Sequence, residues 1–297
     1  MHLTLLGTGC PICDPARMGP SNLVRHGDRA FLVDCGSGAT QRLVGAGSKG
    51  AALDAVFLTH LHSDHIVDLL QLILSSWHQG RDRPQYFYGP SGTRRHVEGL
   101  LELWRPEFEQ RIAHEQRASS TALNVEVVEF DESADAVIWQ GDGIAVRSVK
   151  VEHSPIRNAV GFVFEADGRK LAFSGDTAFC PNLIRAAQGA DVLVHECYLH
   201  HEIKPAPGRT AGSMRNVAAY HTLADEVGKV AAQANVKCLV LNHFVPTQFD
   251  RHEVLARVRA DYSGPIVVGE DLLGLDLRTG ALTYQGAVIG LEALARR

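Results

Sequence analysis

The sequence predicts an α+β protein in which two β-sheets carry helices on their outer faces, built as a single domain over residues 1–297. Three observations support this prediction. Short apolar runs bounded by glycine turns fill the first third and the middle of the chain, which is typical of strands. Segments between and after them have apolar residues three and four positions apart, which is typical of helices. Nothing that resembles a linker divides the chain, so we expect one packed domain.

The first half alternates strands with one long helical region. We expect strands over 3–6, 23–26, 30–34 and 55–59, each next to a glycine turn or a polar turn. The run 66–79 has apolar residues at positions 66, 69, 70, 73, 74 and 77, which form one face of a helix. A strand at 86–88 and helices between about 91 and 118 follow. Residues 84–122 are therefore an expected helical insertion, which would shape either a pocket or a dimer contact.

The second half returns to strands before it ends in helices. We expect strands over 124–129, 144–151, 159–165, 170–174, 192–195 and 238–241. The sequence Ala166-Asp167-Gly168 is a hairpin signal between two of them. Helices are expected over 181–188, 222–235 and 250–261. The polar, proline-rich segment 200–216 is expected to be an irregular flap over an active site.

Composition limits the class of protein and its partners. The formal charge is −5, from 29 Lys and Arg against 34 Asp and Glu, so no overall basic field favours nucleic acid. No apolar run is long enough for a membrane span, and the first residues lack the basic region of a secretion signal. The six cysteines are too few and too scattered for a disulfide framework. We therefore expect a cytoplasmic protein with reduced thiols and a small-molecule ester substrate rather than nucleic acid, although a local groove would still be able to bind a phosphate backbone.

Metal-ligand residues are concentrated at one strand end. The expected strand 55–59 runs directly into His60-Leu-His62-Ser-Asp64-His65. Residues two apart on an extended segment point the same way, so His60 and His62 can reach one metal ion. Asp64 and His65 follow where the chain turns into a helix and can reach a neighbouring position. Imidazole and carboxylate at this density suit zinc, and they also accept iron or manganese.

The stretch Thr59-His-Leu-His-Ser-Asp-His65 resembles the HxHxDH signature of the metallo-β-lactamase-fold metallohydrolases. The resemblance covers residues 3 to about 267 and implies a four-layer αβ/βα sandwich with two mixed sheets. It implies further ligands beyond later strands, and it implies two metal ions. One ion would be held by His60, His62 and His153, the other by Asp64, His65 and His243, with Asp176 as the bridging carboxylate. Asp64 would also orient a metal-bridging hydroxide or accept its proton.

Two further motifs resemble those of ribonuclease Z and its arylsulfatase-like relatives. They are His195-Glu196-Cys197 and Tyr220-His221-Thr222. The resemblance implies that His221 is the general acid for the leaving oxygen, that Glu196 orients it and that His195 has a structural role. The N-terminal stretches 6–11 and 14–21 resemble the arylsulfatase and phosphodiesterase relatives.

Several residues elsewhere in the chain have weaker signals. Arg17 is expected either to meet an anionic substrate group or to be an ordinary surface arginine. Cys10 and Cys13 form a CxxC sequence without a second pair, and we expect plain reduced thiols. His200 and His201 are expected to be solvated loop residues.

These features predict a dinuclear zinc hydrolase that acts on a small anionic ester. A phosphodiester is the first expectation, followed by an aryl sulfate ester and then a lactone. A second hypothesis is ribonuclease Z, although the 23-residue interval from His153 to Asp176 leaves no room for the tRNA-gripping arm of that enzyme. A mononuclear iron sulfur dioxygenase of the same fold is a third hypothesis, and a non-catalytic scaffold is a fourth. Loss of Asp64 or Asp176 would indicate the scaffold, and both residues are present. A homodimer is an expectation from the relatives.

Overall fold

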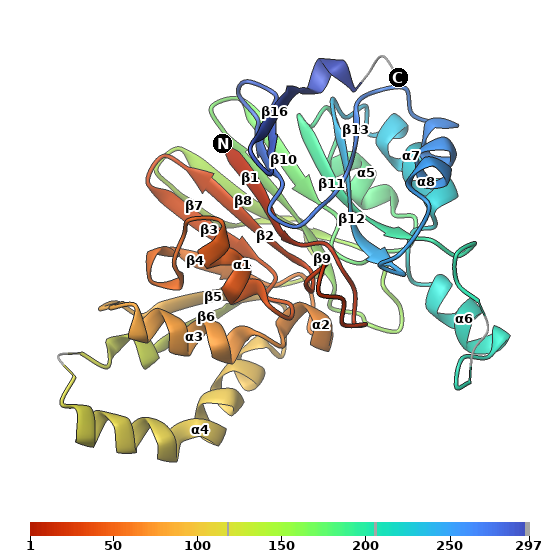
Figure 1. Ribbon diagram of the computed structural model, residues 1–297. Coiled ribbons are helices and arrows are strands. Elements are labelled where there is room, and N and C mark those ends of the chain that lie inside the picture. Colours follow the sequence, from red (N-terminus) through yellow and green to blue (C-terminus); the bar gives the residue numbers. More distant parts are fainter. Residues whose placement is uncertain (118, 205–206, 295–297) are drawn as a thin grey trace.

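The strands of this protein form two sheets that face each other. The computed structural model describes residues 1–117, 119–204 and 207–294 (Figure 1). The first sheet has nine strands, in the spatial order β16 (Ala287–Gly290), β15 (Ala281–Tyr284), β14 (Gly274–Asp276), β1 (His2–Gly7), β2 (Ser21–His26), β3 (Arg29–Val33), β4 (Ala55–Phe57), β5 (Gln85–Gly89) and β6 (Val125–Glu129). Pairing is antiparallel from β16 to β3 and parallel from β3 to β6, so the sheet is mixed.

The second sheet has seven strands and is also mixed. Its spatial order is β13 (Ile266–Val268), β12 (Leu239–Val245), β11 (Val192–Tyr198), β10 (Arg169–Phe173), β9 (Val160–Ala166), β8 (Ile144–Lys150) and β7 (Ala136–Gly141). Pairing is antiparallel from β7 to β10 and parallel from β10 to β13. The strands β8, β10, β11 and β12 therefore run in one direction, and their carboxyl ends lie at the same edge of the sheet.

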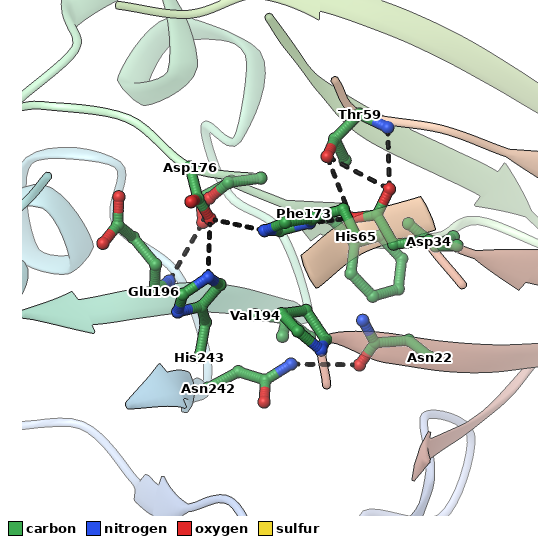
Figure 2. A pocket seen from close by; sticks show the side chains of 14 residues that line it. Asn22, Asp34, Thr59, His65, Phe173, Asp176, Val194, Glu196, Asn242 and His243 are labelled. Carbon is green, nitrogen blue, oxygen red and sulfur yellow. Dashed lines mark hydrogen bonds and ion pairs between the residues drawn. The ribbon is translucent and has the colours of Figure 1, made fainter. Parts of the chain in front are cut away.

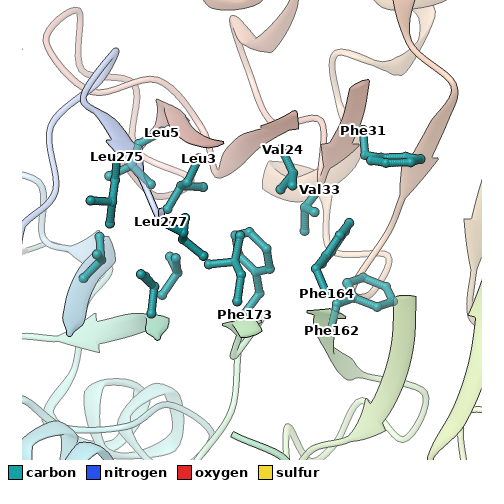
Figure 3. Close-up of a cluster of buried hydrophobic side chains, with 14 of the residues drawn as sticks. Leu3, Leu5, Val24, Phe31, Val33, Phe162, Phe164, Phe173, Leu275 and Leu277 are labelled. Atoms are coloured by element: carbon teal, nitrogen blue, oxygen red, sulfur yellow. The ribbon is translucent and has the colours of Figure 1, made fainter. Parts of the chain in front are cut away.

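The two sheets are held together by an apolar layer with many aromatic rings (Figure 3). Phe31 and Phe57 from the first sheet meet Phe162 and Phe164 from the second, with ring centroids 5.6–6.1 Å apart across the interface. All four side chains are fully buried. Each buries a large apolar area, so this layer is a major source of the stability that fixes the position of the strand ends.

Helices cover the outer face of each sheet. On the first sheet they are α1 (Ala39–Gly45), α2 (Ser63–Ile66), α3 (Leu69–His78) and α4 (Thr93–Glu115), which pack through a second apolar cluster. On the second sheet they are α5 (Pro181–Ala186), α7 (Ala224–Gln233) and α8 (Arg251–Arg259), with a third cluster beneath them. The remaining helix is α6 (Ala211–Ala218), which lies apart from the sandwich in Figure 1. The predicted α+β sandwich with helices outside is confirmed.

Two local predictions need correction, and several elements had not been predicted. The helix predicted over 66–79 begins only at Leu69, as α3, and Ile66 belongs to the short helix α2 before it. Between the two helices, the amide of Asp68 donates to the carbonyl of Cys35 at 3.1 Å. The segment 200–216 is not irregular throughout, since α6 begins at Ala211 with Thr210 as its N-cap. Helix α1, strand β7 and the strands β13 to β16 were not predicted. None of the helices in the described ranges is both long enough and apolar enough to cross a bilayer.

Candidate active site

The metal-type residues lie where the strands of both sheets end. His60 and His62 follow β4, and α2 places Asp64 and His65 immediately beyond them. From the second sheet, His153 follows β8, Asp176 follows β10, and His243 lies near the end of β12. In α/β folds, ligands bind beyond the carboxyl ends of parallel strands. The sandwich therefore brings together residues that are up to 183 positions apart in the chain.

The first group consists of His60, His62, His153 and Asp176. One ligand-type atom from each lies within 4.8 Å of the others. The Nε2 atom of His153 is 3.2 Å from Nδ1 of His62. His60 and His153 are buried, whereas His62 is partly exposed. Three imidazoles facing one point are a ligand set that suits zinc.

The second group consists of Asp64, His65 and His243, again within 4.8 Å of one another. The Nε2 atom of His243 is 3.3 Å from Oδ2 of Asp64, and that of His65 is 3.6 Å from the same oxygen. His243 has a left-handed backbone with φ of 44° inside β12, a conformation that is uncommon for histidine. Such backbone conformations are concentrated at functional sites, where the surrounding fold holds them in place.

Asp176 lies between the two groups, and each of its oxygens faces one of them. Oδ2 is 3.8 Å from Nε2 of His60 and 3.9 Å from Nε2 of His153. Oδ1 is 3.3 Å from Nε2 of His65 and 3.4 Å from Nε2 of His243, both of which point toward it in Figure 2. A carboxylate in this position can serve two cations at once.

Unsatisfied buried atoms show that this site fits cations. Among the described residues, the Nε2 atoms of His60, His65 and His243 and Oδ1 of Asp176 are buried without a hydrogen-bond partner. Buried polar groups are nearly always satisfied, and one cation in each of the two groups would satisfy these four atoms. The local field also favours positive charge. Burial lowers the pKa of His65, but the carboxylates of Asp176, Asp34 and Asp64 raise it to about 10.

Hydrogen bonds behind the histidines fix their orientation. Nδ1 of His65 is 2.9 Å from Oδ2 of Asp34, whose other contacts are the amide and hydroxyl of Thr59 (Figure 2). Nδ1 of His153 is 2.8 Å from the backbone carbonyl of Tyr220. Metal-ligating histidines almost always donate their second N–H in this way. The glycine at position 36 lets α2 pack closely against the loop after β3, because a Cβ at Gly36 would clash with the carbonyl oxygen of Asp64.

Asp34 and the supporting role of Tyr220 were not predicted. From the sequence, Asp34 is expected only as the last residue of a strand. An aspartate that ends an apolar strand and precedes Cys35-Gly36 nevertheless indicates a polar contact at the strand end. The structure gives Asp34 a left-handed φ of 59°, which turns its carboxylate toward His65. The contact of Tyr220 has no sequence signal, because it uses the backbone carbonyl.

His221 and Glu196 form a buried pair beside the two groups. Nδ1 of His221 is 2.7 Å from Oε2 of Glu196, and Oε1 of Glu196 accepts the amide hydrogen of Thr177 at 2.6 Å. Nδ1 of His221 also lies 3.9 Å from Oδ2 of Asp176. Burial lowers the pKa of His221, but Glu196 and then Asp176 raise it above its ordinary value. The pair thus favours a protonated imidazole next to the candidate metal centre. His195 points elsewhere, with Nδ1 2.8 Å from the backbone carbonyl of Glu196.

The residues with weaker sequence signals do not belong to the two ligand groups. Arg17 is not a surface arginine, because its guanidinium is turned inward to protein groups. It is buried and donates to the hydroxyl of Thr8, the carbonyl of Gly269 and the carboxylate of Glu270. Cys10 is a buried thiol and Cys13 an exposed one, and both are free in the described part of the chain. His200 and His201 pair with surface carboxylates of α7 and α8.

Comparisons with known proteins agree with this geometry. The family described as "Anti-Pycsar protein Apyc1" matches residues 1–206. Ribonuclease Z of Mycobacterium marinum is 38% identical over 279 residues, which is 92% of this chain and 97% of the relative. Two solved structures share the fold at a TM-score of 0.70 and cover 93% of this chain and 99% of theirs. They are the metallo-β-lactamase-fold protein YhfI of Bacillus subtilis, at 20% identity, and the short form of human tRNase Z, at 22% identity.

The extent of these matches settles the family. The relative aligns over almost its whole length, and the match includes the segments that hold both candidate ligand groups. The structural neighbours carry the same two-sheet sandwich, as the HxHxDH signature indicated. This chain belongs to the metallo-β-lactamase-fold family of metal-dependent hydrolases, in the branch that includes the mycobacterial ribonuclease Z relatives and the Apyc1 family.

Proposed function

We propose that this protein is a phosphodiesterase that uses two metal ions, zinc in preference to iron or manganese. The observation that carries the proposal is the position of Asp176, whose two oxygens face two separate sets of buried, unsatisfied ligand atoms. His60, His62 and His153 would hold one ion, and Asp64, His65 and His243 the other. Imidazole and carboxylate ligands without thiolate suit zinc in a hydrolytic site. When bound, such ions supply an activated water and neutralise charge on the phosphate.

The residues around the metal groups supply the proton transfers. Burial raises the pKa of Asp64, but His65 and His243 together lower it by more, so its carboxylate stays ionised. The ionised carboxylate accepts a proton from the attacking water. His221 donates a proton to the leaving oxygen from Nε2, since its Nδ1 is held by Glu196. Glu196 is itself fixed by the amide of Thr177, so the acid keeps one orientation throughout the reaction.

A phosphodiester is favoured over an aryl sulfate or a lactone. The relative that is 38% identical is named as a ribonuclease, a class of enzyme that cleaves phosphodiester bonds. The same name supports RNA as the substrate more directly than it supports a small ester. In favour of a small diester, residues 160–173 between His153 and Asp176 form only the hairpin of β9 and β10. RNA and a small phosphodiester therefore contain the same type of bond. The experiment has to decide between them by the size of the substrate that is cleaved.

The first test is the metal content per chain, measured by mass spectrometry beside a panel of substrates. The panel holds bis(p-nitrophenyl) phosphate, p-nitrophenyl sulfate, a lactone and a precursor tRNA. We expect about two zinc ions per chain and turnover of the diester, with Asp176→Ala as the inactive control. Cleavage of the precursor tRNA at its 3′ side would identify RNA as the substrate. One iron per chain without hydrolysis of any substrate would overturn the proposal in favour of a mononuclear iron dioxygenase.

A further inference from the structure

A second cavity, of about 200 Å³, lies next to the His221–Glu196 pair and is used by none of the steps above. Its base is formed where β11 and β12 end, by Tyr198 and Val245. These residues follow Glu196 and His243 by two positions each. One wall is the loop that follows β1, with Ile12, and the other is α6, with Met214 and Val217. The cavity therefore begins at the edge of the candidate active site.

Tyr198 connects this cavity to the proposed general acid. Its ring stacks on the imidazole of His221, with centroids 5.4 Å apart and planes only 6° from parallel. The Tyr198 side chain is almost fully buried, so its ring stays in this place. The leaving oxygen has to lie within hydrogen-bond distance of His221 when it takes the proton. Tyr198 therefore lies between His221 and the cavity, because it stacks on the imidazole and also lines the cavity.

The lining of the cavity is mostly apolar. Ile12 is half exposed, and α6 has no buried residue although Met214 and Val217 lie on one face of it. An apolar ligand that covers the exposed apolar side chains of a concave site removes their surface from water, which stabilises the complex. The polar groups in the lining are few, chiefly Arg209, Ser213 and the thiol of Cys10. An apolar cavity of about 150 Å³ is enough for a benzene ring, so this one has room for a single ring system.

We infer that the cavity between the β1 loop and α6 binds a flat ring carried on the leaving-group oxygen of the substrate. The inference rests on the proposed phosphodiesterase function for the position of the leaving oxygen. It adds a specificity site: diesters with an aromatic or heterocyclic leaving group are preferred over those with a small alkyl group. Tyr198 positions His221 on one side and contacts the ring on the other, and Met214 and Val217 cover the ring.

The test compares two phosphonates that differ only in the ring. Phenylphosphonate and methylphosphonate are titrated into the purified protein with its bound metal, and their affinities are measured by calorimetry. We expect phenylphosphonate to bind at least tenfold more tightly. The variant Met214→Asp should reduce that ratio to about one while the affinity for methylphosphonate stays the same. Val217→Trp, which fills the cavity without adding charge, should have the same effect.

The matched control is Asn216→Asp, which adds the same charge to an exposed position of α6 outside the cavity lining. It should keep the tenfold ratio. Thermal unfolding checks that all three variants fold, which we expect because α6 has no buried residue. Equal affinities for the two phosphonates in the unmodified protein would overturn the inference, as would binding of neither. A ratio that Met214→Asp and Val217→Trp leave unchanged would also overturn it.

The result is separable from the test of the proposed function. Turnover of bis(p-nitrophenyl) phosphate together with equal phosphonate affinities would leave the phosphodiesterase proposal standing and remove the ring site. A clear preference for phenylphosphonate without turnover of any phosphodiester would keep the ring site and remove the phosphodiesterase proposal.

Discussion

Nδ1 of His221 lies 2.7 Å from Oε2 of Glu196, and both side chains are buried beside the carboxylate of Asp176. The two residues are 25 positions apart, on β11 and just before α7. Because Glu196 occupies Nδ1, the other nitrogen of His221 is the one available to a substrate. This relationship separates the proposed acid from the proposed metal ligands and gives the first prediction.

Replacing His221 with alanine should slow turnover without removing metal. We expect a loss of about 10²–10⁴-fold for a diester with a poor alkyl leaving group, which is the usual size of general acid catalysis. The loss for a p-nitrophenyl leaving group should be much smaller, because that group departs without a proton. Rates for both substrates and metal content by mass spectrometry provide the check. Full activity of His221→Ala on the alkyl diester would exclude His221 as the acid.

Removing the carboxylate of Asp176 should affect both ligand groups at once. Asp176→Ala should bind less than one metal ion per chain and lose turnover, because each of its oxygens faces one group. Asp64→Ala should also lose turnover and lower the metal content. Asp225→Asn serves as the control, since Asp225 is a partly exposed carboxylate paired with Arg257 on the outer face. Retention of two metal ions by Asp176→Ala would contradict its bridging position.

The contact between Asp34 and His65 predicts unequal loss of the two metal ions. Asp34→Asn would replace the charged carboxylate that accepts the His65 N–H with a neutral amide. Such changes typically cost about 10–100-fold in metal affinity. The ion at His65 should therefore be released first when a chelator is added in steps. His60 is linked to Asp34 only indirectly, through the hydroxyl of Thr59, so the other ion should lose less affinity. Simultaneous loss of both ions, at the chelator concentration that strips the unmodified protein, would count against this role.

The buried imidazole of His195 should make the free energy of unfolding fall as the pH decreases. Its imidazole is fully buried, and burial lowers its pKa to about 4, against an ordinary value of 6.5. The unfolded chain therefore binds a proton at this residue below pH 6.5, whereas the folded chain does so only near pH 4. Stability falls across that window as the pH decreases, by about 2 kcal/mol between pH 7 and pH 5.

The variant His195→Asn tests this assignment because asparagine keeps a polar side chain and does not titrate. The free energy of unfolding in urea is measured at pH 7 and at pH 5 for both proteins. We expect the variant to be less stable at pH 7 but to lose about 2 kcal/mol less between the two values. An identical pH dependence in the two proteins would show that His195 is protonated equally in the folded and unfolded chains.

The local patterns of this sequence are strong enough to predict most of its elements and its metal-type residues. The strands before His60 and His153 follow from apolar runs that end at polar residues, and the hairpin at Asp167-Gly168 follows from turn chemistry, with both residues at positive φ. The HxHxDH stretch predicts its own geometry because side chains alternate along an extended segment. The less regular elements have weaker signals. Helix α6 was missed because its polar, proline-rich surroundings hide a short amphipathic turn.

Only the tertiary structure decides how these pieces meet. The backbone carbonyl of Tyr220, the carboxylate of Asp34 and the ring of Tyr198 gain their roles from contacts with residues 67, 31 and 23 positions away, respectively. Such contacts depend on sheet register and on the packing of two sheets through the aromatic layer, neither of which leaves a periodic signal in the chain. The sequence by itself determined which metal-type residues are present and their order along the chain. The packed sandwich determined their distances, the burial that leaves their atoms unsatisfied, and the cavity beside His221.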